Sequence, residues 1–496
     1  MDPPSNKTPD SANTSKLEDQ IVLSSFNQPL NPPHCDKNEQ SDKQSAKYAE
    51  EVELTEIFDM VLLCTCAKAK KVSCDISSET SSEVEKRPKN AALDLRTLLI
   101  SCAQSVASGD KESASEKLMQ IRQESSSTGD TYQRLASVFV DGLKARLSRG
   151  GATLSKGGSI EFLALPMSFT GTAVQPYAAL TPKRITDTAD NLKAYHVHLS
   201  SCPFIKLSIS FANKMIFHTA RNATTLHIID FGILYGFQWP ILIQLLSAIP
   251  GGPPKLRITG IDLPQPGFKP AEHLEETGRL LARYCERFNV PFKYNPIVIQ
   301  NWERIEIKDL KLESGEFVAV NCLFRSENLS DETLDVECPR DAVLSLIQKM
   351  NPDIFVQGVT NGSYNSPFFV TRFQEALLHY SALFDMFDAT LPRDDQQRLH
   401  FEQELYRREV MNVIACEGAE RVERPETYEQ WQVRNVRAGF KILPLNQEVM
   451  KTLKDNVEAG YHRDFVLYED GNWMVQGWKD RIICASSCWI PLHRSC

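Results

Sequence analysis

The chain has 496 residues and a formal net charge of −9 at pH 7. Single hydrophobic cores stop growing at roughly 250–300 residues, so a chain of this length has room for a large core or for two lobes. The negative charge argues against a protein that coats nucleic acid unaided, because phosphate contacts need clustered lysine and arginine, although a local basic face remains open.

The first 90 residues are expected to be a disordered region that carries one short helix. Ser, Asn, Asp, Lys and Pro dominate up to about residue 47, and such a segment has too little apolar surface to bury. Residues 48–66 instead have helical periodicity, with acidic residues opposite an apolar face. That face consists of Leu54, Ile57, Phe58 and Val61. The helix either folds on contact with a partner or docks back on its own domain. Basic clusters at residues 68–71 and 86–89 are candidates for a nuclear import signal.

Residues 91–200 are predicted to form a helical cap that rests on a later α/β core. The predicted cap helices span residues 95–106, 111–122, 131–147 and 191–199. Asp94 suits the N-cap of the first helix, because its side chain can accept hydrogen bonds from the first turn. Residues 148–184 are rich in Gly, Ser and Thr and exceed the usual length of a loop, which favours a mobile insertion.

The α/β core begins with an apolar, β-branched run that ends in Asp and Gly. The predicted strand and turn contain Leu226, His227, Ile228, Ile229, Asp230, Gly232 and Gly236. This pattern is typical of a parallel strand that leads into a tight turn, where ligands bind in open α/β sheets. A dinucleotide site needs G-x-G-x-x-G, but here Ile233, Leu234 and Tyr235 separate the two glycines. We expect these bulky side chains to fill the space of a cofactor, which favours a Rossmann-like scaffold with a closed turn.

Strands and helices alternate regularly after this turn, which predicts a mostly parallel sheet with right-handed crossovers. Further strands are predicted at residues 256–262, 291–299, 317–324, 353–359 and 410–416, and helices at 241–248, 270–288, 339–350, 367–387 and 393–408. Antiparallel hairpin strands are predicted at residues 465–469, 473–477 and 481–487. A mostly parallel sheet that ends in antiparallel strands resembles the core of class I methyltransferases, and we assign it to residues 201–492.

Several short motifs resemble those of the plant GRAS family. Residues 226–230 are similar to its VHIID motif, residues 367–373 and 408–409 to its PFYRE region, and residues 431, 439, 478 and 487–489 to its SAW region, with Cys488 in place of the alanine. The resemblance runs from about residue 93 to residue 489 and is closest to the scarecrow-like branch. It implies a GRAS domain over residues 91–492, in which the leucine-rich cap takes part in protein contacts and in homo- or heterodimer formation.

The same resemblance implies a function in the nucleus. Scarecrow-like relatives act as transcriptional co-regulators, which implies recruitment to promoters by DNA-binding factors such as bZIP proteins and a part in stress or detoxification responses. Direct, sequence-specific DNA binding is the alternative, because the family allows it for some members. Arg279, Arg283 and Arg287, which share one predicted helix, are candidates for such a contact.

Neither a catalytic site nor a cofactor or metal site is indicated. In a methyltransferase, Asp262 would hold ribose hydroxyls and Asp230 would anchor the first turn. Residues 321–325, after the fourth predicted strand of the parallel sheet, carry no recognisable acid-base signature. The thirteen cysteines lack the paired spacing of a structural zinc site, and no uncharged apolar run reaches 18 residues. S-adenosylmethionine-dependent methyl transfer is therefore a remote alternative, and no membrane span is expected.

Charged residues and tryptophans in the C-terminal part are predicted to hold the last elements to the sheet. The charged candidates are Arg408, Glu409, Arg421, Glu423, Arg424, Arg437 and Glu448, the last two on either side of a turn at Gly439. Arginine and carboxylate side chains form paired hydrogen bonds that fix geometry when they are partly buried. Trp431, Trp478 and Trp489 are expected to be core anchors because of their large apolar area.

Overall fold

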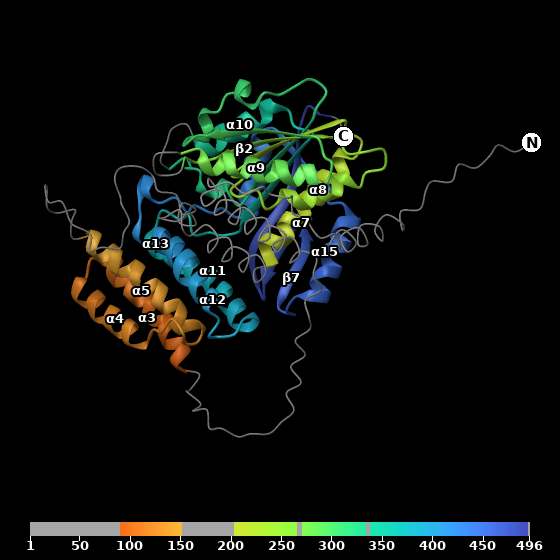
Figure 1. Cartoon of the computed structure of the whole chain (residues 1–496). Coiled ribbons are helices and arrows are strands. Elements are labelled where there is room, and N and C mark those ends of the chain that lie inside the picture. Colours follow the sequence, from red (N-terminus) through yellow and green to blue (C-terminus); the bar gives the residue numbers. More distant parts are fainter. Residues whose placement is uncertain (1–89, 151–202, 265–269, 334–337, 495–496) are drawn as a thin grey trace, which may run out of the picture.

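The computed structural model describes residues 90–150, 203–264, 270–333 and 338–494 (Figure 1). These residues form an α/β part around one sheet and a helical lobe beside it. The expected disordered tail with its acidic helix, the predicted helix at residues 191–199 and nearly all of the 148–184 insertion lie outside the described residues.

Nine strands of the described residues form one sheet, in the order β3-β2-β1-β4-β5-β9-β8-β7, with β6 paired to β9. The strands are β1 (Thr225–Phe231), β2 (Lys255–Asp262), β3 (Phe292–Val298), β4 (Phe317–Leu323), β5 (Ile354–Thr360), β6 (Phe440–Ile442), β7 (Phe465–Asp470), β8 (Trp473–Trp478) and β9 (Arg481–Pro491). Strands β1 to β5 are parallel to one another, and β9, β8 and β7 add antiparallel pairs next to β5. This confirms the predicted fold class, a mostly parallel, Rossmann-like sheet that ends in antiparallel strands.

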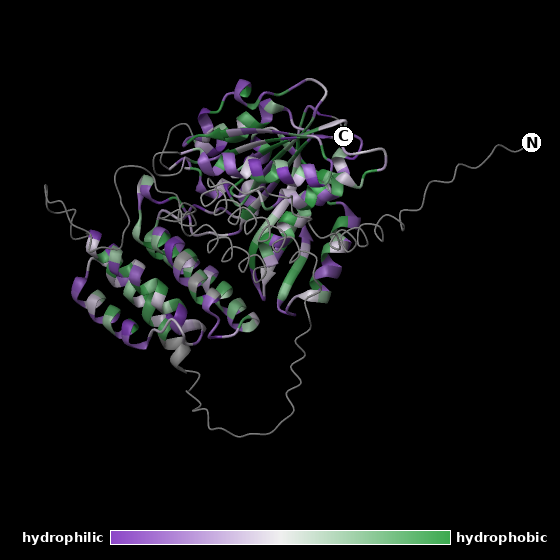
Figure 2. Ribbon diagram, in the orientation of Figure 1, coloured by the Kyte–Doolittle hydropathy of each residue, from purple (hydrophilic) through white to green (hydrophobic). Residues whose placement is uncertain are grey.

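Helices cover both faces of the sheet, which explains why β1 is buried along nearly its whole length. One face is covered by α7 (Pro203–Ala220), α8 (Trp239–Ser247), α9 (Glu272–Arg287) and α15 (Gln447–Gly460). The other face is covered by α10 (Pro339–Met350) and α14 (Tyr428–Arg437). Hydrophobic residues run through the strands, and the helices alternate hydrophobic and hydrophilic residues along their length, as expected when each buries one side (Figure 2).

The helical lobe combines elements from two distant parts of the sequence. It consists of α3 (Asn90–Ser108), α4 (Lys111–Glu124) and α5 (Thr131–Gly150) together with α11 (Phe369–Thr390), α12 (Gln396–Phe401), a π-helical turn (Glu402–Tyr406) and α13 (Arg407–Ala415). Helix α5 packs against α11 and α13, and the lobe shares one hydrophobic core with the neighbouring face of the sheet (Figure 1). The N-terminal helices α3, α4 and α5 thus form one lobe with helices from much later in the chain.

Residues 410–415 are helical, so the sixth strand predicted at residues 410–416 is wrong. They belong to α13, which continues the helix that begins at Gln396. Val410, Val413 and Ile414 are buried and recur at helical spacing on one face of α13. A short run of β-branched residues has the composition of a strand, but here packing against α5 and α11 decides the conformation.

Three helices escaped the sequence prediction, and the assigned start of a fourth was wrong. Helix α7 is apolar on nearly all sides, so it lacks the periodicity that reveals an amphipathic helix. Helix α14 begins with a capping box formed by Thr427 and Gln430, and Asn446 caps α15, so local signals did exist for these two. Helix α3 begins at Asn90, which places Asp94 inside the helix and not at its N-cap.

Candidate functional site

The turn after β1 is closed by its own backbone. Gly232, Leu234 and Gly236 have φ angles of +89°, +50° and +69°. The N–H of Gly232 donates to the carbonyl of Ile261 (2.8 Å), and that of Gly236 donates to the carbonyl of Ile233 (2.9 Å). Leu234 is held in its unusual conformation from both sides: its N–H donates to Asp262 (3.1 Å), and its carbonyl accepts from the Thr277 hydroxyl (2.9 Å).

Asp230 is the centre of a buried polar network beneath this turn. The parallel register aligns Asp230 of β1 with Asn321 of β4, and the Asn321 amide donates to the Asp230 carboxylate (2.8 Å). The Trp239 indole donates to the other carboxylate oxygen (2.8 Å), and the Gln238 amide donates to Asn321 (3.1 Å). Burial raises the pKa of Asp230 to about 7, although the two hydrogen bonds act in the opposite direction. Asp230 thus joins β1, β4 and α8.

Protein side chains occupy the place where a methyltransferase would hold its cofactor. Asp262 accepts from the backbone N–H groups of Leu263 (2.8 Å) and Leu234 (3.1 Å) and from the Arg325 guanidinium (3.3 Å). A Cβ atom added to Gly232 would lie 2.6 Å from Cγ of Arg325, so this side chain covers the glycine. The residues present do not fit S-adenosylmethionine, because the acid and the glycine that would receive it are already in contact with the protein itself.

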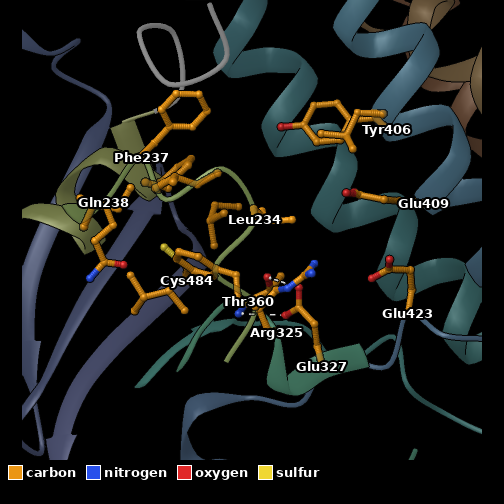
Figure 3. A pocket seen from close by; sticks show the side chains of 18 of the residues that line it. Leu234, Phe237, Gln238, Arg325, Glu327, Thr360, Tyr406, Glu409, Glu423 and Cys484 are labelled. Carbon is orange, nitrogen blue, oxygen red and sulfur yellow. Dashed lines mark hydrogen bonds between the residues drawn. The ribbon is translucent and has the colours of Figure 1, made fainter. Parts of the chain in front are cut away.

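A cavity of about 170 Å³ lies beside the turn, between the carboxyl ends of the parallel strands and the helical lobe. Leu234 and Phe237 from the turn, Arg325 from the end of β4 and Tyr406 from the lobe line it (Figure 3). Glu409 and Glu423 lie across the cavity from the turn, and their carboxylates are directed into it (Figure 3). Two parts of the molecule that lie far apart in the sequence therefore share this cavity.

The remaining residues of the VHIID-like segment lie inside the sheet. Leu226, Ile228 and Ile229 are fully buried apolar side chains. The imidazole of His227 is hydrogen-bonded to Glu316 (3.0 Å) and to the Thr259 hydroxyl (2.9 Å). Desolvation by burial lowers the pKa of His227 to about 4, so the ring is neutral at pH 7. These residues build the strand, and His227 is not among the residues that line the cavity.

Some of the charged residues that were predicted to form C-terminal ion pairs lie on the surface. Arg408, Arg437 and Glu448 are exposed, and among the described residues no ion pair joins Arg437 to Glu448. Glu409 accepts from the Tyr380 hydroxyl (3.0 Å) at the edge of the cavity. Arg437 was thus the wrong arginine of α14, because helical periodicity turns it toward solvent.

A network of ion pairs centres instead on buried Arg434, one turn earlier on α14. Its guanidinium pairs with Glu426 (2.9 Å), Asp341 (2.8 Å) and Glu332 (3.0 Å). Arg340 also pairs with Glu426 (2.8 Å), and the Arg424 guanidinium, which was predicted to pair, binds Asp331 (3.2 Å). Arg421, also predicted to pair, donates instead to the Asn365 amide oxygen (2.9 Å). This network joins α10, α14 and the loop before α14.

The three tryptophans that were expected to be core anchors are buried. Trp431, Trp478 and Trp489 are each no more than 2% exposed. The Trp478 indole donates to Asp385 of α11 (2.7 Å), and the Trp489 indole donates to the Ser487 hydroxyl (2.7 Å). Gly439, with φ of +88°, forms the turn between α14 and β6.

The three arginines considered for DNA contact share one face of α9, at intervals of four residues. Arg279 and Arg283 both lie against Glu276, at 2.9 Å and 3.7 Å, and the Arg287 guanidinium lies 5.6 Å from the centre of the Phe288 ring. Glu276, which contacts both arginines, reduces the positive potential that a phosphate would meet.

In the part of the chain that the structure describes, no three acidic, histidine or cysteine side chains converge on a metal position. Among the helices described, none has the length and apolar character to cross a membrane.

Comparison with known proteins gives one consistent result. The model of the GRAS domain family matches residues 95–490. The chain is 51% identical to Scarecrow-like protein 14 of Arabidopsis thaliana over 91% of its own length and 58% of that protein's, so it spans little more than half of that relative. It is 32% identical to Scarecrow-like transcription factor PAT1 of the same plant, over 87% of this chain and 82% of the relative. Among solved structures, SCL7 of Oryza sativa matches with a TM-score of 0.65 and 26% identity, over 80% of this chain and 99% of that one.

Proposed function

The chain belongs to the GRAS domain family, and we propose that it is a nuclear transcription regulator that acts by binding other proteins. In this proposal a DNA-bound factor, of the bZIP type, recruits it to promoters. The observation that carries the proposal is the closed turn after β1. Because Arg325 and Asp262 occupy the place of a cofactor, the methyltransferase-like sheet serves as a rigid scaffold and not as a catalyst. The names of its relatives, which include a transcription factor, support a role in transcription.

The helical lobe is the surface that we propose for the partner. Helix α4 packs on α3 and α5 and lies on the outer side of the lobe, away from the sheet (Figure 1). It buries few of its residues, and Met119 on it is 62% exposed. An exposed apolar side chain on an outer helix is a feature of surfaces that receive another helix. The same surface also suits a second GRAS chain, which keeps dimer formation within this proposal.

A DNA-binding assay with the full chain tests the proposal. Labelled promoter DNA with a bZIP site would be titrated with the chain, with and without the bZIP protein, at several salt concentrations. We expect the chain to join the DNA only when the bZIP protein is present, and Met119→Glu to weaken this. Val433→Glu is the matched control, because Val433 is 58% exposed on α14, on the other side of the sheet.

Binding to DNA without the bZIP protein, with a steep salt dependence, would replace the proposal by direct DNA reading. In that case the double variant Arg279→Ala and Arg283→Ala should weaken binding, whereas recruitment through a partner leaves it unchanged. If Met119→Glu and Val433→Glu had equal effects, the conclusion would be that the partner does not bind at α4.

A further inference from the structure

Two buried glutamates and one half-buried glutamate line the cavity beside the turn. Glu327 lies on the short helix η6 (Ser326–Asn328) after β4, Glu409 lies on α13, and Glu423 lies in the loop before α14. In Figure 3 all three carboxylates are seen around the same space. They come from separate elements, so their meeting results from the packing of the lobe against the sheet.

Two of the three carboxyls have hydrogen-bond partners, and one does not. Glu327 accepts from the hydroxyl (3.0 Å) and the N–H (3.2 Å) of Thr360, and Glu409 accepts from the Tyr380 hydroxyl (3.0 Å). Glu423 is only 6% exposed, yet its Oε1 atom has no hydrogen-bond partner among the described residues. His379 also lines this cavity and is 2% exposed, and its Nδ1 atom likewise has no hydrogen-bond partner among the described residues.

Buried polar atoms in proteins nearly always have partners, because leaving one unsatisfied costs about 1–3 kcal/mol. A carboxylate oxygen that faces a cavity accepts hydrogen bonds, and a neutral imidazole has one nitrogen that accepts. Desolvation lowers the pKa of His379 to about 3, so its ring is neutral at pH 7. The two unsatisfied acceptor atoms, Glu423 Oε1 and His379 Nδ1, therefore match a ligand that donates hydrogen bonds.

The charges around the cavity point to a positive ligand. Burial raises the pKa of Glu409 to about 8 and that of Glu327 to about 7. Burial and repulsion from the other two carboxyls raise the pKa of Glu423 well above its ordinary value. The nearest positive group, Arg325, lowers the pKa of Glu327 and Glu423, but it also faces Asp262. A cation bound among the three acids would attract each carboxylate and so offset the repulsion between them.

The size and walls of the cavity limit the kind of cation. The remaining lining is largely apolar and aromatic, with Leu383, Phe401, Leu405 and Tyr406 contributed by the lobe. Aromatic faces attract cations and also cover an apolar body. A bare metal ion fits poorly, because among the described residues no three ligand side chains converge closely enough to hold one.

We propose that this cavity binds a small organic cation, an amine or guanidinium compound that has an apolar body and about six to ten non-hydrogen atoms in all. This size is comparable to that of benzene, which an engineered cavity of about 150 Å³ holds. The cationic group would lie among Glu327, Glu409 and Glu423, and the apolar body would lie against the lobe helices. Such a ligand would contact both the sheet and the lobe. This inference goes beyond the proposed function, because no part of recruitment by a DNA-bound factor requires it.

Calorimetry on the full chain tests the inference with two probes and their uncharged counterparts. 2-Phenylethylamine and butylguanidine would each be compared with the alcohol of the same carbon skeleton. We expect at least one cation to bind and to raise the melting temperature, while the alcohols bind at least about tenfold more weakly, as the loss of a charged hydrogen bond predicts. Binding should release protons, so the measured heat should differ between phosphate and Hepes buffers.

Glu423→Gln is the decisive variant, because glutamine has the shape of a protonated glutamate but cannot become negative. We expect it to fold as well as the wild type and to bind the cation at least about tenfold more weakly. Glu458→Gln, on the exposed part of α15, is the matched control and should bind normally. Glu409→Gln repeats the test at a second carboxyl. If one of the two variants fails to fold, the other still tests the inference.

Three results would overturn the inference. The first is that neither cation binds, and the second is that the alcohols bind as tightly as the cations. The third is that Glu423→Gln and Glu409→Gln both keep the affinity of the wild type. Loss of partner-dependent DNA binding in the promoter assay would not affect any of these measurements, so the two proposals fail separately.

Discussion

Replacing Gly232 by alanine should destabilise the protein more than replacing any open glycine of similar conformation. Gly232 has φ of +89°, and the added Cβ would lie 2.6 Å from Cγ of Arg325. Gly315 provides the matched control, because it has φ of +82° and no atom within 4 Å of its added Cβ. Both variants carry the same backbone strain, so the difference between them isolates the contact with Arg325.

The two costs can be estimated separately. Alanine in a left-handed conformation costs about 1–2 kcal/mol, which applies to both glycines. Overpacking at a filled site adds about 1–3 kcal/mol, which applies only to Gly232. We therefore expect Gly315→Ala to lower the free energy of unfolding by about 1–2 kcal/mol and Gly232→Ala by about 2–5 kcal/mol.

Urea denaturation of the two variants, in the wild-type background and in an Arg325→Ala background, measures these costs. If Arg325 is the obstacle, Gly232→Ala should cost no more than Gly315→Ala once Arg325 has been truncated. Equal destabilisation by the two glycine variants in the wild-type background would refute the reasoning. So would a cost of Gly232→Ala that is the same with and without the Arg325 side chain, because the turn would then not be closed by this residue.

The buried ion pairs and the buried acids provide two further tests. Arg434→Ala removes one of the two cationic partners of buried Glu426, which still pairs with Arg340, and should cost about 1.5–3 kcal/mol in urea denaturation, whereas Arg437→Ala, on the exposed side of the same helix, should change stability by less than about 0.5 kcal/mol. Similar costs for the two would show that the network around Arg434 does not hold α14 to α10. Because folding raises the pKa of Glu409 from 4.5 to about 8, its protonated form contributes stability that is complete below the lower value and is lost as the pH rises through the higher one. The urea midpoint should therefore fall less between about pH 5 and about pH 8 in Glu409→Gln than in the wild type, and identical slopes would count against a buried acid at this position.

The parallel part of the fold could be predicted from the sequence because its signals are local. The apolar run from Leu226 ends in Asp230 and Gly232, and β2, β4 and β5 are likewise short, largely apolar runs followed by an α-helix. Residues 410–416 show where this reasoning fails. A run of β-branched residues fits a strand or one face of a buried helix, and only the helices that pack against it decide between them.

The sequence by itself determined the order of the parallel strands, the closed turn and the family, because these depend on residue types at short, regular spacing. Only the tertiary structure decided which side chains meet. Arg325 covers Gly232 because β4 lies beside β1 in the sheet, and no spacing along the chain announces that contact. In the sequence Glu423 was one more candidate for the ion pairs that hold the last elements to the sheet. Packing of the lobe against the sheet buries it instead, beside Glu327 and Glu409, since burial and charge repulsion depend on neighbours in space and not on neighbours along the chain.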